Sequence, residues 1–143
     1  MLQIVYLSHL TSEMIDSGDQ GHIDEILERA YQYNAKNNLT GILLYKGGVF
    51  LQWLEGEKED VEKLYGKICL DLRHERITLL IKQDAEERIF EHWSMLYKKV
   101  EEIDLEKLKM NISWDQIVSD SRNNIKTSEE IIMKLLKAFK FQK

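Results

Sequence analysis

The 143-residue sequence contains no proline, one cysteine and seven glycines. The absence of proline, together with so few glycines, argues against a long flexible linker and for regular elements joined by short connections. A single cysteine excludes an internal disulfide framework. Cys69 falls in the apolar register of a predicted helix, so we expect a small buried hydrophobic side chain rather than a nucleophile.

Long apolar runs and a basic charge balance are also missing. No stretch approaches the roughly 18 apolar residues of a membrane-spanning helix, and the first residues, MLQIVYLSHL, lack the basic start of a signal peptide. The formal net charge is −5, which argues against a nucleic-acid footprint. We therefore expect a cytoplasmic protein of one ordinary domain's size that binds neither a membrane nor nucleic acid.

The common catalytic signatures are absent as well. The sequence has no HExxH, CxxC or GxSxG motif and no glycine-rich phosphate loop. Its four histidines, His9, His22, His74 and His92, show no metal-ligand spacing. These absences argue against a metal site and favour a protein that is not an enzyme.

The most informative stretch is a predicted β-hairpin in the first half of the chain. Two short apolar runs, 42–45 and 49–54, flank the sequence Lys46-Gly47-Gly48, a pattern typical of a tight hairpin. Alternation along the second run places Phe50, Gln52 and Leu54 on one face and Val49, Leu51, Trp53 and Glu55 on the other.

Gln52 is therefore a polar residue between two large apolar neighbours. A buried amide needs partners, because leaving it unpaired costs about 1–3 kcal/mol. One interpretation is that this amide grips a heteroaromatic ligand. The other is that it pairs with backbone at a sheet edge.

The remaining pattern predicts alternating strands and helices. We expect strands over residues 2–8, 75–83 and 90–100, helices over 22–36 and 57–72, and a loop over 9–21. The order βαββαβ with a further strand predicts an α+β fold, a ferredoxin-like sandwich. In the first strand, Tyr6 shares a face with Ile4.

Basic side chains crowd the end of the second predicted helix. Lys67, Arg73 and His74 would favour that end electrostatically. The functional interpretation is a cationic mouth for a phosphate or a similar anion.

From residue 101 onward the pattern becomes purely helical. Short helices are expected near residues 105–110 and 114–118, and a longer one begins at Thr127, with Glu130 completing a capping box. We expect two units, residues 1–100 and a helical extension over 101–143. The extension would pack on the open face of the sheet or on a partner.

Three segments together resemble a known family. TGILLYKGGVFLQWLEG, DLRH (Asp71 to His74) and ERIFEHWSM (Glu87 to Met95) are similar, in order and spacing, to BLUF domains, blue-light sensors using flavin. The resemblance covers residues 1–100 and implies FAD, or FMN, as cofactor. Because only about 43 residues follow, the chain resembles the short stand-alone members, which signal to a separate protein regulator and in some cases form homo-oligomers.

The resemblance also implies roles for individual residues. Tyr6 and Gln52 would form the photochemical switch, and Trp93 and Met95 would relay the signal, with one of them next to Gln52. The implied cofactor-binding residues are Ile26, Asn34, Leu43, Phe50, Gln52, Lys67, Ile68, Asp71, Arg73 and His74. The family often has proline where this chain has Leu72.

Other functions stay open at this point. One is a flavin-binding protein without photoswitching, and another is a small ferredoxin-like enzyme, although no positioned nucleophile or anion-binding loop is evident. An RNA-binding module shares this topology, but the acidic balance of the chain argues against it.

Overall fold

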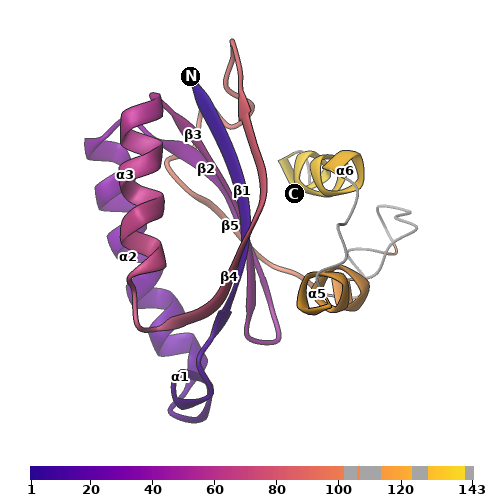
Figure 1. Ribbon diagram of the computed structural model, residues 1–143. Helices are drawn as coiled ribbons and strands as arrows, with labels where there is room; N and C mark the ends of the chain where they lie inside the picture. The colour runs from indigo at the N-terminus through magenta and orange to yellow at the C-terminus, as the bar shows by residue number, and fades with distance from the viewer. Residues whose placement is uncertain (102–105, 107–113, 124–128, 141–143) are drawn as a thin grey trace.

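The computed structural model describes residues 1–101, 106, 114–123 and 129–140. Figure 1 shows its elements. In chain order they are β1 (Leu2–Leu10), α1 (Ser12–Asp16), α2 (Asp19–Lys36), β2 (Thr40–Lys46), β3 (Val49–Gly56), α3 (Lys58–Cys69), β4 (His74–Asp84), β5 (Leu96–Lys99), α5 (Trp114–Arg122) and α6 (Glu129–Lys140).

The strands form one five-stranded sheet in the order β4-β1-β3-β2-β5. The first four strands pair antiparallel, and β5 adds to β2 in parallel. This arrangement is the ferredoxin-like βαββαβ topology with one extra strand, which confirms the predicted α+β fold. Because β3 lies between β1 and β2, its residues are central and not at an edge.

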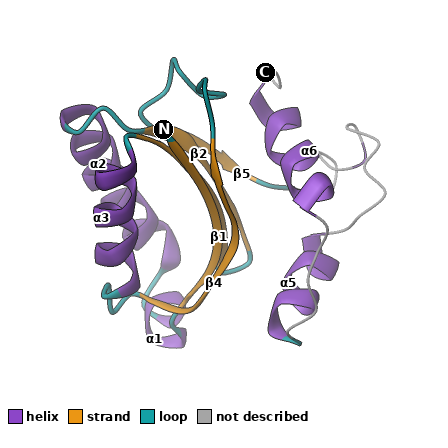
Figure 2. Ribbon diagram, turned by 45° about the horizontal axis from the view of Figure 1, so that its top comes forward, coloured by secondary structure: helices purple, strands orange, loops and turns teal. Residues whose placement is uncertain are grey.

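Helices cover both faces of the sheet. Figures 1 and 2 show α2 and α3 against one face, called the inner face here, and α5 and α6 against the other, the outer face. The inner cluster contains Ile4, Tyr6, Phe50 and Leu54, and the outer cluster contains Val5, Leu51 and Trp53. The alternation predicted for β1 and β3 is thus confirmed.

The hairpin between β2 and β3 also forms as predicted. Gly47 and Gly48 make its two-residue turn, with φ angles of 58° and 83°. Both angles lie in the left-handed region that a hairpin turn of this kind requires and that glycine adopts at little cost.

The prediction of a loop over residues 9–21 is wrong. β1 extends to Leu10, α1 follows, and α2 already begins at Asp19. Thr11 starts α1 as its N-cap, accepting a hydrogen bond from the Met14 N–H on its side-chain oxygen. Ser, Thr and Asp favour both loops and helix caps, so composition alone could not separate the two.

Two other expectations fail near element ends. α3 stops at Cys69, so the Cys69 side chain is exposed rather than buried, and Leu72 is 89 % exposed in the turn that follows. The fifth strand covers only Leu96–Lys99. Trp93 therefore lies in the irregular segment before it, outside any strand.

The C-terminal helices are found where apolar periodicity indicated. α5 buries Trp114, Ile117 and Val118, and α6 buries Leu136 and Phe139, all in the outer cluster. The helix expected near residues 105–110 and the Thr127 cap lie outside the described residues. Within the described ranges, no helix has both the length and the apolar character needed to cross a membrane.

Candidate functional site

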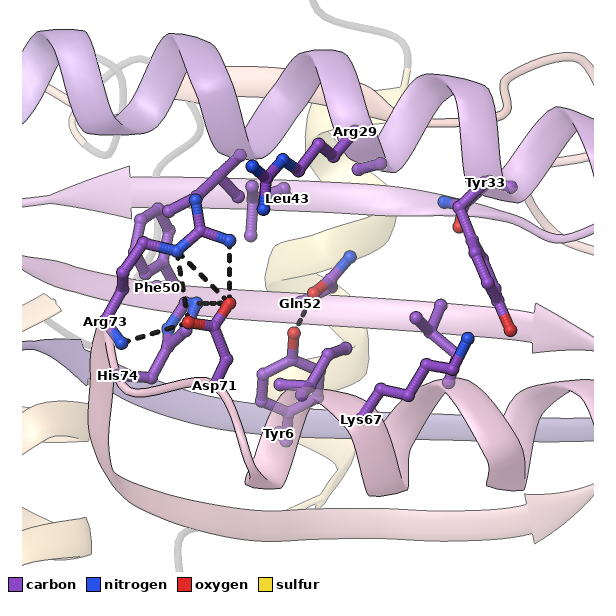
Figure 3. A pocket seen from close by; sticks show the side chains of 15 residues that line it. Tyr6, Arg29, Tyr33, Leu43, Phe50, Gln52, Lys67, Asp71, Arg73 and His74 are labelled. Atoms are coloured by element: carbon purple, nitrogen blue, oxygen red, sulfur yellow. Dashed lines mark hydrogen bonds and ion pairs between the residues drawn. The ribbon is translucent and has the colours of Figure 1, made fainter.

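A pocket of about 410 Å³ lies between α2, α3 and the inner face of the sheet. Figure 3 shows the side chains around it. The structure brings together every residue proposed for cofactor binding, along with Tyr6; the lining includes Tyr6, Ile26, Asn34, Leu43, Phe50, Gln52, Lys67, Ile68, Asp71, Arg73 and His74. Its size suits an organic ligand.

Tyr6 and Gln52 meet at the floor of this pocket. They are directly paired residues of β1 and β3, and the Tyr6 hydroxyl donates a hydrogen bond to Gln52 Oε1 (Figure 3). Burial is the main reason that the pKa of Tyr6 is raised, so its hydroxyl keeps its proton at neutral pH. Gln52 is thus bonded to another side chain, and the interpretation of an edge amide is wrong.

The other end of the Gln52 amide points to Met95. Gln52 Nε2 donates to Met95 Sδ at 3.5 Å. Trp93 instead packs against the outer cluster, while its carbonyl accepts a hydrogen bond of 3.2 Å from the Gly41 N–H. Of the two residues expected to carry the signal, Met95 is the one next to Gln52.

Asn34 supplies an unpaired acceptor to the pocket. Its side chain, on the last turns of α2, is 0 % exposed, and its Nδ2 donates to the Ser94 carbonyl at 2.8 Å. Its Oδ1 has no hydrogen-bond partner in the protein. An orphaned buried acceptor is costly, so this oxygen indicates a place for a ligand N–H.

Asp71, Arg73 and His74 form a polar cluster at one end of the pocket. Arg73 Nη2 contacts Asp71 Oδ2 at 2.8 Å, and Ser8 Oγ lies 3.2 Å from His74 Nδ1. Burial opposes ionisation of Asp71, but its hydrogen bonds and ion pair to Arg73 outweigh burial and lower the pKa of Asp71. The pKa of His74 is lowered, chiefly by burial, which favours the neutral imidazole.

The three basic residues expected to share one cationic mouth are separated. Arg73 and His74 lie at one end of the pocket, whereas Lys67 lies at the opposite end (Figure 3). Lys67 Nζ sits 4.6 Å from the centroid of the Tyr33 ring, a cation–π contact. The positive charge is therefore divided between the two ends and does not form a single anion site.

Apolar side chains form the walls between these ends. Phe50 and Leu43 rise from the sheet, Ile26 comes from α2 and Ile68 from α3. The sequence interpretation missed four lining residues: Arg29, Ala30, Tyr33 and Leu64. Helical spacing could have found them, because positions 26, 30 and 33, and likewise 64 and 68, share one face of their helices.

This combination fits a flavin. Apolar walls suit a flat aromatic ring system, the Asn34 Oδ1 acceptor suits a ring N–H, and the central Tyr6–Gln52 pair offers an amide that can donate or accept. Among residues 1–101, 106, 114–123 and 129–140, no group of three or more His, Cys, Asp or Glu side chains could hold a metal ion.

Comparison with known proteins points the same way. A family model described as BLUF, sensors of blue-light using FAD, matches residues 1–96. The chain is 37 % identical over 87 residues to the blue light- and temperature-regulated antirepressor BluF of Escherichia coli (strain K12). That alignment covers 61 % of this chain but only 21 % of the antirepressor.

Solved structures extend the similarity beyond the matched segment. The photo-activated state of BlsA superposes with a TM-score of 0.80 at 26 % identity, covering 99 % of this chain and 96 % of BlsA. A bacterial light-regulated adenylyl cyclase gives a TM-score of 0.70 at 33 % identity, covering 87 % of this chain and 35 % of the cyclase.

Proposed function

This chain belongs to the BLUF family of sensors of blue light using FAD, and on that premise we propose that Tyr6 and Gln52 form its photochemical switch. The chain is a blue-light photoreceptor domain. The observation that carries the proposal is the continuous buried contact from the Tyr6 hydroxyl to Gln52 Oε1 and from Gln52 Nε2 to Met95 Sδ.

The bound flavin supplies absorption of blue light and an excited state that accepts an electron. The protein's part is to hold a donor and a proton route close by. Tyr6 is buried and protonated and touches Gln52, so loss of an electron from Tyr6 would be accompanied by movement of its phenolic proton toward Gln52 Oε1.

Once the electron and the proton have returned to Tyr6, Gln52 can keep a changed pattern of hydrogen bonds without any change in net charge. An amide carries both an acceptor and two donors, so rotation or tautomerisation exchanges the groups presented to its neighbours. The present bond from Nε2 to Met95 would be exchanged or lost. A new donor facing the ligand carbonyl would shift the flavin absorption to the red.

The remaining pocket residues would bind the cofactor. Asn34 Oδ1 would accept from a ring N–H, and Ile26, Ile68, Leu43, Phe50 and His74 would pack on the ring. Lys67, Asp71 and Arg73 would contact the polar parts of the ligand at the two ends of the pocket. FAD is the cofactor of the family, and FMN shares the same ring.

We also propose that the output is a change in protein contact and not a reaction. The similarity to a blue light- and temperature-regulated antirepressor supports this output. The partner would be a separate protein regulator or a second copy of this chain. A lone cysteine that is free and exposed suits a reducing compartment, the cytoplasm.

The test is the Tyr6→Phe variant, loaded with flavin and compared in the dark and under blue light. We expect it to bind flavin but to lose the reversible red shift, because the phenolic proton is gone. Tyr33→Phe is the matched control, since it removes a hydroxyl from another residue of the same pocket and should keep the shift. A normal red shift in Tyr6→Phe would refute the proposed switch.

A further inference from the structure

A buried carboxylate lies on β3, three residues beyond Gln52. Glu55 is 0 % exposed. Both of its carboxylate oxygens accept hydrogen bonds, five in all, from Ile89 N–H (2.9 Å), Phe90 N–H (2.6 Å), Thr40 Oγ1 (3.1 Å), Gln3 Nε2 (3.2 Å) and Trp53 Nε1 (3.2 Å). We call these groups the Glu55 cluster.

The Glu55 cluster ties a loop to the centre of the sheet. A buried carboxylate is expensive unless its oxygens are fully hydrogen-bonded, and here two of the donors are consecutive backbone N–H groups, of Ile89 and Phe90. They begin the segment 89–95, the later part of the connection from β4 to β5, which has no regular structure. The carboxylate therefore takes the place of a strand partner for this segment.

The far end of segment 89–95 reaches the flavin pocket. The Ser94 carbonyl accepts from Asn34 Nδ2, and Met95 Sδ accepts from Gln52 Nε2. Between the two ends, the Trp93 carbonyl accepts from the Gly41 N–H. The segment is thus held at the pocket by two side-chain amides, and at the sheet by the Glu55 carboxylate and the Gly41 N–H.

The near end of the segment faces the C-terminal helices. The Phe90 ring lies edge-on to Trp53, with centroids 5.4 Å apart. Both residues belong to the outer cluster, which also contains Trp114 of α5 and Phe139 of α6. Segment 89–95 therefore links the inner pocket to the packing beneath α5 and α6.

We propose that Glu55 is a positioning residue that couples the switch to the C-terminal helices. By fixing Ile89 and Phe90, it makes segment 89–95 a short tether, so that displacement of Met95 must shift Phe90 against Trp53. Without this anchor the segment would absorb the displacement locally. The inference rests on the proposed function of Tyr6 and Gln52.

The anchor can be tested without flavin or light. Glu55→Gln replaces one acceptor oxygen with an NH₂ group that faces donors, so at least one N–H loses its partner. In the flavin-free protein, amide hydrogen exchange at Ile89 and Phe90 should be about tenfold faster or more. Glu87→Gln is the control, because the Glu87 side chain is exposed in the same loop. Unchanged exchange in Glu55→Gln would overturn the anchoring role.

The coupling is tested in the flavin-loaded protein. Wild-type protein should show a red shift in light together with altered amide exchange in Glu129–Lys140. Glu55→Gln should keep the red shift, because Tyr6 and Gln52 are intact, but lose most of the light-induced change in α6. A purely stabilising role would leave that light–dark difference unaltered, and this result would overturn the proposal.

Failure of the switch and failure of the coupling give different results. If wild-type protein shows no red shift, the proposed function fails and the coupling fails with it, while the flavin-free exchange still decides whether Glu55 anchors the segment. If Glu55→Gln does not fold, Thr40→Val removes one of the five donors at nearly constant volume. Thr40→Val should show a smaller increase in amide exchange at Ile89 and Phe90 and a smaller loss of the light-induced change in α6. Wild-type behaviour in both measurements would overturn the proposal.

Discussion

At the scale of single residues, the site is defined by which polar atoms have partners and which do not. Tyr6, Gln52 and Met95 satisfy one another, whereas Asn34 Oδ1 is buried without a partner. A pocket that leaves one acceptor unmet while pairing its central amide is prepared for a ligand that supplies the missing donor.

Most of these residues could be named from the sequence because the family motifs carry them. What the motifs could not provide was the choice between Trp93 and Met95. That choice depends on where β5 begins, since Trp93 lies in the irregular segment before the strand and Met95 immediately precedes the strand. The sequence pattern placed Glu55 on the correct face of its strand. Its five hydrogen-bond donors could not be predicted from any local pattern, because they come from four separate parts of the chain.

The buried histidines predict a pH dependence of stability. Burial lowers the pKa of His74 and of His9 from the ordinary value of 6.5. As the pH falls below 6.5, the unfolded chain takes up protons that the folded protein resists, so the free energy of unfolding should decrease. Urea unfolding at pH 7.5 and 5.5 measures this slope.

His74→Gln should flatten that slope in part, because His9 still contributes. The control is His92→Gln, whose side chain is 74 % exposed in the native protein and which should keep the wild-type slope. Equal slopes in wild type and His74→Gln would contradict the assignment of a buried neutral imidazole to His74.

At the scale of elements, the space around a glycine decides whether a larger side chain can replace it. Gly41 in β2 faces the Trp53 carbonyl of β3 so closely that an added Cβ would overlap that oxygen. Gly66 in α3 has nothing within 4 Å of the corresponding position. Replacing these two glycines by alanine should therefore change the free energy of unfolding in opposite directions.

Gly41→Ala should destabilise the protein by about 1–3 kcal/mol, because strand backbone must shift to admit the methyl group. Gly66→Ala should stabilise it by about 0.4–1 kcal/mol, because it restricts the unfolded chain at a helical position. Chemical denaturation of both variants measures the difference. Loss of stability in Gly66→Ala equal to that in Gly41→Ala would show that neither effect comes from the β2–β3 contact.

The type of an element was predictable where its apolar periodicity was strong. The predicted ends of helices were wrong where capping residues, and not the apolar pattern, determine them. The hairpin, α2, α3 and β4 follow from alternation and helical spacing. α1 was missed because its five residues bury no side chain and so show no apolar stripe. The end of α3 was placed too late because Leu72 looked like a continuation of that stripe, although it is exposed beyond the last turn.

At the scale of the whole molecule, the sheet separates two apolar clusters that pack against different helices. The inner cluster surrounds the pocket, and the outer cluster joins the sheet to α5 and α6. Packing of the C-terminal helices should therefore influence stability without changing the environment of the bound flavin in the dark.

Leu136→Ala tests this separation. Leu136 is fully buried in the outer cluster, so its truncation should cost about 2–5 kcal/mol. The dark absorption spectrum of bound flavin should stay as in wild type. Lys137→Ala, at an exposed position of the same helix, is the control for helix propensity. A changed dark spectrum in Leu136→Ala alone would show that the packing of α6 acts on the flavin already in the dark, and not only through the light-induced displacement of Met95.

The central claim is that light changes the hydrogen bonding of Gln52 in the flavin pocket. The most direct measurement is the light-minus-dark absorption spectrum of flavin-loaded wild-type protein beside Gln52→Leu, which removes the amide at similar volume. The account predicts a red shift in wild type that decays in the dark, and no such shift in Gln52→Leu. A wild-type spectrum that does not shift, or an equal shift in Gln52→Leu, would contradict it.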